Sequence, residues 1–263
     1  MHRLLEILLF TVDPVLARQA RAAGVAGVIV DWERRACDPR RAAVDIGAPD
    51  SPEDLRIISA AVPGPVYCRI NRPGPQTPAE IACALDGGAT HLIVPMIEGP
   101  DEVARVLDLV QGRAAVGVMI ETEPACRAVK AIAALPLDFA YVGLLDLAIC
   151  RGEGNPFHIL VDGTADRVRE AFAGIRFGIG GVTAIDAGSP VPAIDLLGEL
   201  ARLETGFVFA RRSFRRDMAD RDLDVEVARI GQAWQRLRSR DAAQVAADHA
   251  RFVREYGTSR PAS

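Results

Sequence analysis

The stretch HLIVPMIEGPDEVARVLDLVQGRAAVGVMIE, residues 91–121, contains one complete unit of the predicted fold. It opens with an apolar run over His91–Met96, continues with helical spacing of apolar residues over Asp101–Gln111, and closes with a second apolar run over Ala115–Glu121. Both short runs are apolar at consecutive positions, as in strands that are buried on both faces. A strand, a helix and a second strand in this order predict parallel strands covered by helices.

The same rhythm extends over most of the chain. The expected strands are Glu6–Val12, Gly27–Asp31, Val66–Ile70, His91–Met96, Ala115–Glu121, Phe139–Gly143, Arg176–Gly181 and Gly206–Ala210. Segments with helical spacing separate them, for example Pro14–Ala23 and Pro124–Ala134. Eight such units in 263 residues favour an α/β fold of the (β/α)8 TIM-barrel type. The alternative is an open doubly wound sheet, which usually carries a glycine-rich phosphate loop after its first strand, and Thr11–Pro14 offers none.

The helix boundaries carry their own signals. Asp13, Ser51 and Thr77 each stand directly before a proline, which is the pattern of a capping residue followed by proline at the first helical position. Two further helices are expected after the eighth strand, over Leu223–Arg238 and Ala242–Tyr256. We therefore predict a catalytic TIM-barrel domain over residues 1–240. The C-terminal helix and tail, residues 241–263, are expected to pack on a neighbouring subunit of a homo-oligomer, a trimer or hexamer.

The composition limits the class of protein. Hydrophobic residues make up 49% of the chain and charged residues 25%, as in ordinary globular domains, while 5% aromatic residues predict a core of Val, Ile, Leu and Ala. The net charge of −4 with interspersed signs gives no electrostatic case for a nucleic-acid or membrane partner. The apolar run Leu4–Phe10 is too short to span a bilayer. Five widely spaced cysteines without a C-x-x-C motif favour a reducing compartment, so we expect a cytoplasmic protein.

Polar side chains stand where several predicted strands end, the end at which TIM barrels carry their chemistry. Asp31 and Glu33 end the second strand, Arg69 the third, Glu121 the fifth and Asp146 the sixth. The last two follow neighbouring strands, so their carboxylates are expected side by side as ligands of Mg2+ or Mn2+. Taken singly, each acid also fits a helix cap, and Arg69 also fits a salt bridge that closes the barrel mouth.

Five motifs together resemble one known family. In chain order they are Val28–Glu33, Cys68–Asn71, Gly88–Met96, Gly117–Thr122 and Tyr141–Leu147. They resemble the HpcH/HpaI aldolase and citrate lyase beta-subunit family over roughly residues 10–160. The resemblance implies a metal-dependent carbon–carbon lyase or aldolase that acts on a 2-oxo acid, pyruvate or an oxaloacetate-type compound, through an enolate.

The same resemblance implies roles for individual residues. Glu121 and Asp146 correspond to the metal ligands, and Arg69 to the arginine that faces the carbonyl or enolate oxygen. The backbone N–H groups of Leu145 and Asp146 correspond to the cradle for the substrate carboxylate, at the positive end of a helix. Asp31 and Glu33 correspond to the acids of the second strand near the metal.

The chain departs from that pattern at one informative position. Where the pyruvate aldolases have a histidine as acid or base, this chain has Arg34. A metal-bound water, Glu33 and His158 remain as candidates for a general base. The glycine-containing segment Cys150–Val161 is the expected lid over the site.

Arginines follow the eighth strand at Arg211, Arg212, Arg215 and Arg216. They fit a solvated face, or they bind a second anionic substrate such as a phosphate or an acyl-CoA tail, for which we single out Arg211 and Arg212. The second reading favours a citrate-lyase-like or acyl-CoA lyase or condensing enzyme. A further alternative, supported by the missing histidine, is an inactive barrel that serves as a binding or assembly subunit.

Overall fold

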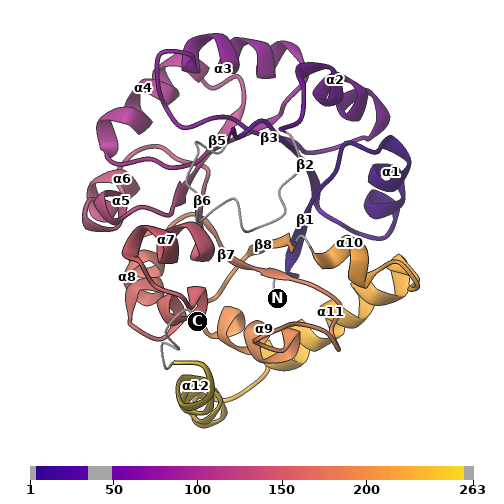
Figure 1. Ribbon diagram of the computed structural model, residues 1–263, viewed down its shortest axis with the longest axis vertical. Helices are drawn as coiled ribbons and strands as arrows, with labels where there is room; N and C mark the ends of the chain where they lie inside the picture. Colours follow the sequence, from indigo (N-terminus) through magenta and orange to yellow (C-terminus); the bar gives the residue numbers. More distant parts are fainter. Residues whose placement is uncertain (1–3, 35–48, 212, 258–263) are drawn as a thin grey trace.

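The computed structural model describes residues 4–34, 49–211 and 213–257. Eight parallel strands form a closed barrel in chain order, and β1 closes the ring by pairing with β8 (Figure 1). The strands are β1 Glu6–Phe10, β2 Gly27–Asp31, β3 Val66–Arg69, β4 His91–Val94, β5 Ala115–Ile120, β6 Phe139–Val142, β7 Arg176–Val182 and β8 Phe207–Ala210. The predicted TIM barrel is confirmed, and each predicted strand is present.

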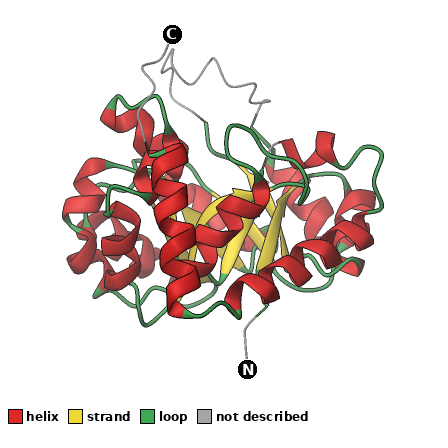
Figure 2. Cartoon of the chain, turned by 90° about the horizontal axis from the view of Figure 1, so that it is seen from below, coloured by secondary structure: helices red, strands yellow, loops and turns green. Residues whose placement is uncertain are grey.

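Helices surround the barrel as an outer ring (Figures 1 and 2). They are α1 Pro14–Ala22, α2 Pro52–Ala61, α3 Thr77–Asp86, α4 Pro100–Val110, α5 Glu123–Arg127, α6 Val129–Ala133, α7 Leu144–Arg151, the 3-10 helix η1 Pro156–Leu160, α8 Thr164–Ala171, α9 Ala193–Arg202, α10 Ser213–Asp217, α11 Leu223–Arg238 and α12 Ala242–Tyr256.

Two predicted helix details are wrong. The segment Pro124–Ala134 is not one helix, because the backbone at Ala128 (φ −89°, ψ 7°) leaves the helical region and separates α5 from α6. Thr77 does not cap α3. Its Oγ1 accepts a hydrogen bond from Gly74 N–H instead, and the capping position is Gln76. Asp13 and Ser51 do cap α1 and α2 through their side chains, as predicted.

Side chains inside the barrel alternate along the strands with side chains that face the helices. The inward cluster consists of Leu8, Ile29, Tyr67, Ile93, Met119, Phe139, Tyr141, Phe207 and Phe209. Five of these nine are aromatic, so the expected aliphatic core describes the layer between strands and helices but not the barrel interior. The rings fit because glycines face them: a Cβ on Gly117 would lie 2.0 Å from the ring of Phe139.

The N-terminal end of the barrel is closed by a cation among aromatic rings. The guanidinium of Arg176 lies 4.5 Å from the ring centroid of Phe207, donates to the hydroxyl of Tyr67 at 2.8 Å, and forms an ion pair with Glu6. The His91 ring lies 4.3 Å from the ring of Tyr67. His91 therefore belongs to the structural end of the barrel, as its position at the start of its strand predicts.

The last helix, α12, packs against α9 of its own chain and lies outside the ring of Figure 1. Phe252 is buried there, the Tyr256 hydroxyl donates to Asp195, and His249 Nδ1 lies 2.9 Å from an oxygen of Glu199. Packing of this helix on a neighbouring subunit stays a prediction.

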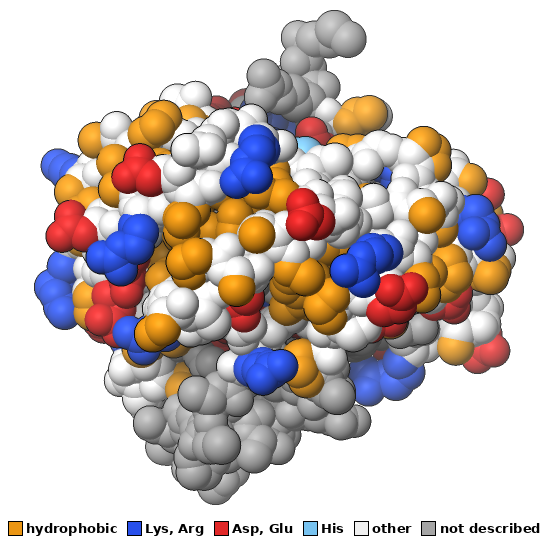
Figure 3. Space-filling view, turned by 90° about the horizontal axis from the view of Figure 1, so that it is seen from above, with side chains coloured by type: hydrophobic (Ala, Val, Ile, Leu, Met, Phe, Trp, Pro, Cys, Tyr) orange, Lys and Arg blue, Asp and Glu red, His pale blue; other side chains and the backbone are white. Residues whose placement is uncertain are grey.

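On the face in Figure 3, positive and negative side chains are interspersed. Within the described ranges, none of the helices combines the length and the apolar character needed to cross a bilayer.

The half-buried His91 predicts a dependence of stability on pH. Burial and, to a smaller extent, the neighbouring charge of Arg176 lower the pKa of His91 to about 4. The unfolded chain, with an ordinary histidine pKa of about 6.5, thus binds more protons between these values. The free energy of unfolding should therefore rise with pH from about 4 to about 6.5, with a slope that corresponds to at most one bound proton. In His91→Gln this part of the pH dependence should be missing. Urea unfolding of both proteins at several pH values measures it, and equal slopes would contradict the assignment.

Candidate active site

The C-terminal ends of the strands continue the inward alternation with polar side chains. Asp31 follows Ile29 on β2, Arg69 follows Tyr67 on β3, and Glu121 follows Met119 directly after β5. All three are thus directed into the barrel mouth by the period of two in the strand. The structure brings together the residues that the sequence singles out at these strand ends.

Arg69 is the centre of a buried ion-pair group. Its Nε donates to Oδ1 of Asp31 at 2.8 Å, its Nη2 to Oδ2 of Asp31 at 2.5 Å, and its Nη1 lies 3.0 Å from Oε2 of Glu33. The Arg69 side chain is 5% exposed and the Glu33 side chain 3%. Burial alone would lower the pKa of Arg69, but the charges of Glu33 and Asp31 outweigh it and raise that pKa. The alternative of a salt bridge across the barrel mouth is therefore realised.

The two acids do not use all of the hydrogens of Arg69. A guanidinium carries five N–H groups, and the hydrogen bonds to Asp31 use one on Nε and one on Nη2. The contact of Nη1 with Oε2 of Glu33 is an ion pair without a hydrogen bond. The Sδ of Met119 lies 3.9 Å from Nη1, which makes a weak contact on that side. Asp31 and Glu33 consequently fix the orientation of Arg69, and these contacts do not use all of its N–H groups.

Glu121 is fully buried, with 0% of its surface exposed. Its Oε1 accepts a hydrogen bond from Met96 N–H at 2.8 Å, whereas no donor within the described part of the chain reaches its Oε2. Burial raises the pKa of Glu121 well above the ordinary range, and repulsion from Asp146 and Glu33 raises it further, while Arg69 opposes the shift. The metal-free protein therefore loses stability as the pH rises and this carboxyl ionises.

The backbone around Glu121 is arranged to hold its carboxylate. Met96 adopts a positive φ of 54°, a conformation that costs a non-glycine residue about 1 kcal/mol or more, and in it the Met96 N–H points at Glu121. Gly143 lies on the other side. A Cβ at this position would stand 2.3 Å from Oε2 of Glu121. A side chain at residue 143 would displace the carboxylate.

Asp146 lies in the first turn of α7, directly after β6, and only 7% of it is exposed. No side chain of the described residues caps this helix, and its internal hydrogen bonds begin with Leu147 N–H donating to Gly143 C=O at 3.0 Å. The N–H groups of Leu145 and Asp146 precede that bond. They stand at the positive end of the helix, where an anionic group is stabilised.

These residues fit a divalent cation. The charges of Asp31, Glu33 and Glu121 act on the Arg69 guanidinium, and the charges of Asp146 and Glu33 act on Glu121. A buried carboxylate oxygen without a hydrogen-bond donor, beside a second carboxylate, is the donor set that Mg2+ or Mn2+ prefers. Glu121 and Asp146 would hold the ion.

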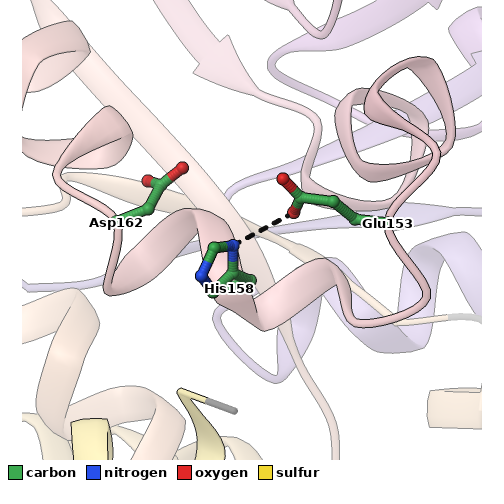
Figure 4. A group of neighbouring side chains, drawn as sticks. All are labelled: Glu153, His158 and Asp162. Atoms are coloured by element: carbon green, nitrogen blue, oxygen red, sulfur yellow. Dashed lines mark hydrogen bonds and ion pairs between the residues drawn. The ribbon is translucent and has the colours of Figure 1, made fainter. Parts of the chain in front are cut away.

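A second group of potential ligands lies elsewhere. Glu153, His158 and Asp162 have ligand atoms within 4.8 Å of one another, and His158 lies between the two acids (Figure 4). Asp162 is already paired with Arg151 at 2.7 Å. This group sits around η1, which packs against α7 and α8.

The segment predicted as a lid, Cys150–Val161, packs into the helical layer of the barrel, and its role as a lid stays a prediction. Phe157, Ile159 and Leu160 are buried in the layer between strands and helices, and Asn155 Nδ2 donates to Tyr256 C=O at the end of α12. His158 is thus placed among Glu153 and the helices, not among Arg69 and the mouth acids. Arg34, at the position of the family's histidine, is exposed, and its N–H donates to Oδ1 of Asn71.

The arginines after β8 differ from one another. Arg211 is half-buried, Arg216 is exposed, and Arg212 lies outside the described residues. Sequence reasoning missed Gly143 and Met96. The only signal for Gly143 was its place between a buried strand and the first turn of the next helix, and the signal for Met96 was the preceding Pro95, which interrupts the strand pattern.

Metal binding should be visible in thermal stability. Because a divalent cation offsets the repulsion among the buried carboxylates, Mg2+ or Mn2+ at 100 times its dissociation constant should raise the Tm by about 5–10 °C. Glu121→Gln should abolish this increase and should leave the metal-free protein no less stable than the wild type. Calorimetry with and without the ion measures both effects. Glu98→Gln is the matched control, since Glu98 is exposed and pairs with Arg72; an unchanged metal response in Glu121→Gln would rule out the ligand assignment.

A second prediction concerns the space beside Glu121. In Gly143→Ala, about ten times more metal ion should be needed for the same rise in Tm, because the new Cβ collides with Oε2 of Glu121. Gly231→Ala in α11 is the control, because a Cβ there meets no atom within 4 Å. Far-UV circular dichroism checks that both variants fold. Wild-type metal affinity in a folded Gly143→Ala protein would show that Glu121 is not constrained as described.

The chain was compared with known proteins. No protein-family model and no curated protein matches it in sequence. Among solved structures it is similar to an HpcH/HpaI aldolase/citrate lyase family protein from Burkholderia cenocepacia J2315, with 23% identity, 90% of this chain and 95% of that chain covered, and a TM-score of 0.61. The HpcH/HpaI aldolase from Desulfitobacterium hafniense DCB-2 gives 15% identity, 91% and 94% coverage and a TM-score of 0.60. The citrate synthase SbnG gives 19%, 89% and 94%, and 0.61. The chain therefore has the fold of proteins in the HpcH/HpaI aldolase and citrate lyase family, the family that its motifs resemble.

Proposed function

We propose that this protein is a divalent-metal-dependent carbon–carbon lyase or aldolase that acts on a 2-oxo acid through an enolate. The observation that carries the proposal is the fully buried Glu121 carboxylate, which lies beside Asp146 at the C-terminal end of the barrel. The neighbouring acids repel the Glu121 carboxylate, and buried like charges destabilise a fold. A barrel that served only as a scaffold would gain nothing from this arrangement. The proposal includes membership of the HpcH/HpaI aldolase and citrate lyase family, which the five sequence motifs and the shared fold support.

The reaction requires a place for electrons. When the bond between C3 and C4 of a 4-hydroxy-2-oxo acid breaks, its electron pair remains on C3 and delocalises onto the 2-oxo oxygen as an enolate. The hydroxyl on C4 loses its proton and becomes a carbonyl group. A bound Mg2+ or Mn2+ would supply Lewis-acid stabilisation of the enolate oxygen.

The residues of this chain supply the rest. Asp31 and Glu33 hold the Arg69 guanidinium in place, so that its remaining N–H groups stabilise the developing negative oxygen without reorganisation. The N–H groups of Leu145 and Asp146 orient the substrate carboxylate at the start of α7. Among the bases considered, Glu33 lies inside this site, whereas His158 lies beside η1. Glu33 or a water molecule therefore remains as the proton acceptor.

A condensing enzyme of the citrate synthase type is the second candidate. The similarity to a structure titled as a citrate synthase favours it, since that barrel has the same fold at nearly the same coverage. Both candidates use the same enolate site and differ in the second substrate.

The direct test is binding and turnover of a 2-oxo acid with defined variants. Oxalate, a mimic of the pyruvate enolate, should bind the wild type by calorimetry only in the presence of Mg2+ or Mn2+. Glu121→Gln and Asp146→Asn should lose this binding and lower kcat/KM by about 10³-fold or more. Arg69→Lys, which loses the planar fork, should lower kcat/KM by about 10²-fold.

Glu98→Gln serves as the control at the same rim and should retain wild-type binding and turnover. Absence of metal-linked oxalate binding by the wild type would instead support the inactive-barrel alternative.

A further inference from the structure

Arg211 stands at an inward-facing position at the end of β8. Phe207 and Phe209 belong to the inward cluster, whereas Val208 and Ala210 face the helices. Residue 211 continues the inward series by the alternation of the strand. It therefore lies at the same C-terminal end of the barrel as Asp31, Arg69 and Glu121, and β8 is separated from β2 by β1 alone (Figure 1).

The neighbouring strand makes room for this arginine. A β-bulge in β7 pairs Gly178 with Phe207 and Gly181 with Phe209, so both inward positions of β7 near its end are glycine. A Cβ on Gly178 would lie 2.5 Å from the ring of Phe207, and a Cβ on Gly181 would lie 2.8 Å from Cγ of Arg211. The stem of Arg211 thus passes through space that a side chain on β7 would fill.

Arg211 differs from Arg69 in its partners. Within the described part of the chain, no carboxylate comes within ion-pair distance of it, and its Nη2 donates only to the C=O of Ser189 at 3.3 Å. Asp217 is the acid whose charge acts on it, but Oδ2 of Asp217 accepts from Thr183 Oγ1, and Oδ1 faces Arg216. Burial lowers the pKa of Arg211, and Asp217 only partly opposes this effect.

A half-buried guanidinium that no described carboxylate pairs with loses hydration, and the single hydrogen bond to Ser189 C=O replaces it only in part. Its planar fork matches a carboxylate or a phosphate, either of which would replace that hydration with two parallel hydrogen bonds. Barrels commonly bind such anionic groups at the ends of the seventh and eighth strands.

The surroundings connect Arg211 to the enolate site. Tyr141 packs on Phe209, and its hydroxyl donates a hydrogen bond to the C=O of Gly180. A Cβ on Gly180 would lie 3.6 Å from Leu144 at the start of α7. The end of β7 therefore contacts both Arg211, at Gly181, and the start of the helix that carries Asp146, at Gly180.

We propose that Arg211 binds the anionic group of the second substrate, so that the acceptor or released carbonyl compound carries a carboxylate or a phosphate. This inference rests on the proposed lyase or aldolase function. It adds that the enzyme selects its carbonyl partner by charge, with Arg211 as the specificity-determining residue.

The first experiment measures anion binding without metal and without turnover. Succinate and inorganic phosphate are titrated separately into the wild type and into Arg211→Gln and Arg211→Lys by calorimetry. The glutamine variant should bind at least about tenfold more weakly, and the lysine variant should fall in between, because it keeps the charge and loses the fork. A preference for succinate identifies a carboxylate, and one for phosphate identifies a phosphoryl group.

Arg216→Gln is the matched control, since it removes the same charge from an exposed side chain on α10, five positions further along. It should bind both anions as the wild type does. Equal weakening in Arg216→Gln and Arg211→Gln, or no anion binding by the wild type, would overturn the proposal.

The second experiment separates this inference from the proposed function. Condensation of pyruvate is measured with glyoxylate, an anionic aldehyde, and with acetaldehyde, a neutral one. Arg211→Gln should lower kcat/KM for glyoxylate by about tenfold or more and leave the value for acetaldehyde unchanged. Equal losses with both aldehydes would contradict the role of Arg211. Absence of activity in the wild type would contradict the proposed function, and the binding experiment would still decide whether Arg211 is an anion site.

Discussion

The burial of the Glu121 carboxylate next to other acids is the constraint around which the barrel mouth is organised. An ionised carboxylate in such a place is costly, and Arg69 opposes the repulsion only in part because it is already paired with Asp31 and Glu33. The left-handed backbone at Met96 and the missing side chain at Gly143 both serve to hold this one group. Stability is thus given up locally at the place where chemistry is proposed.

The barrel was predictable because buried parallel strands have a simple sequence pattern. Runs such as Val28–Asp31 are apolar at consecutive positions, and helices with clear amphipathic spacing separate them. The strand ends could be located as well, and with them the acids and Arg69. The aromatic filling of the barrel interior could not be predicted, since it depends on which glycine faces which ring across neighbouring strands, as Gly117 faces Phe139.

Other features depend on contacts between residues far apart in sequence. The sequence left open whether Arg69 faces a substrate or closes the mouth; the geometry shows that pairing with Asp31 still leaves N–H groups for a ligand. The capping position of α3 was missed because Thr77 Oγ1 accepts a hydrogen bond from Gly74 N–H instead of capping the helix. The break at Ala128 was missed because the helical spacing of Pro124–Ala134 runs through it without a glycine or an internal proline. His158 was a candidate base on chain order alone, and folding places it next to Glu153.

The bulge in β7 gives this strand one residue more than β8 between the same two pairs of the ladder. One extra residue between Gly178 and Gly181 sets which backbone positions face inward beyond it. Deleting one residue there would remove the bulge and restore regular alternation, with Gly181 still opposite Phe209 and Val182 still opposite Ala210. The local bend of the strand would be lost without the replacement of any side chain. A one-codon deletion would therefore reshape the backbone beside Arg211 while every side chain around it stays the same, so strand length is as informative as residue identity when related barrels are compared.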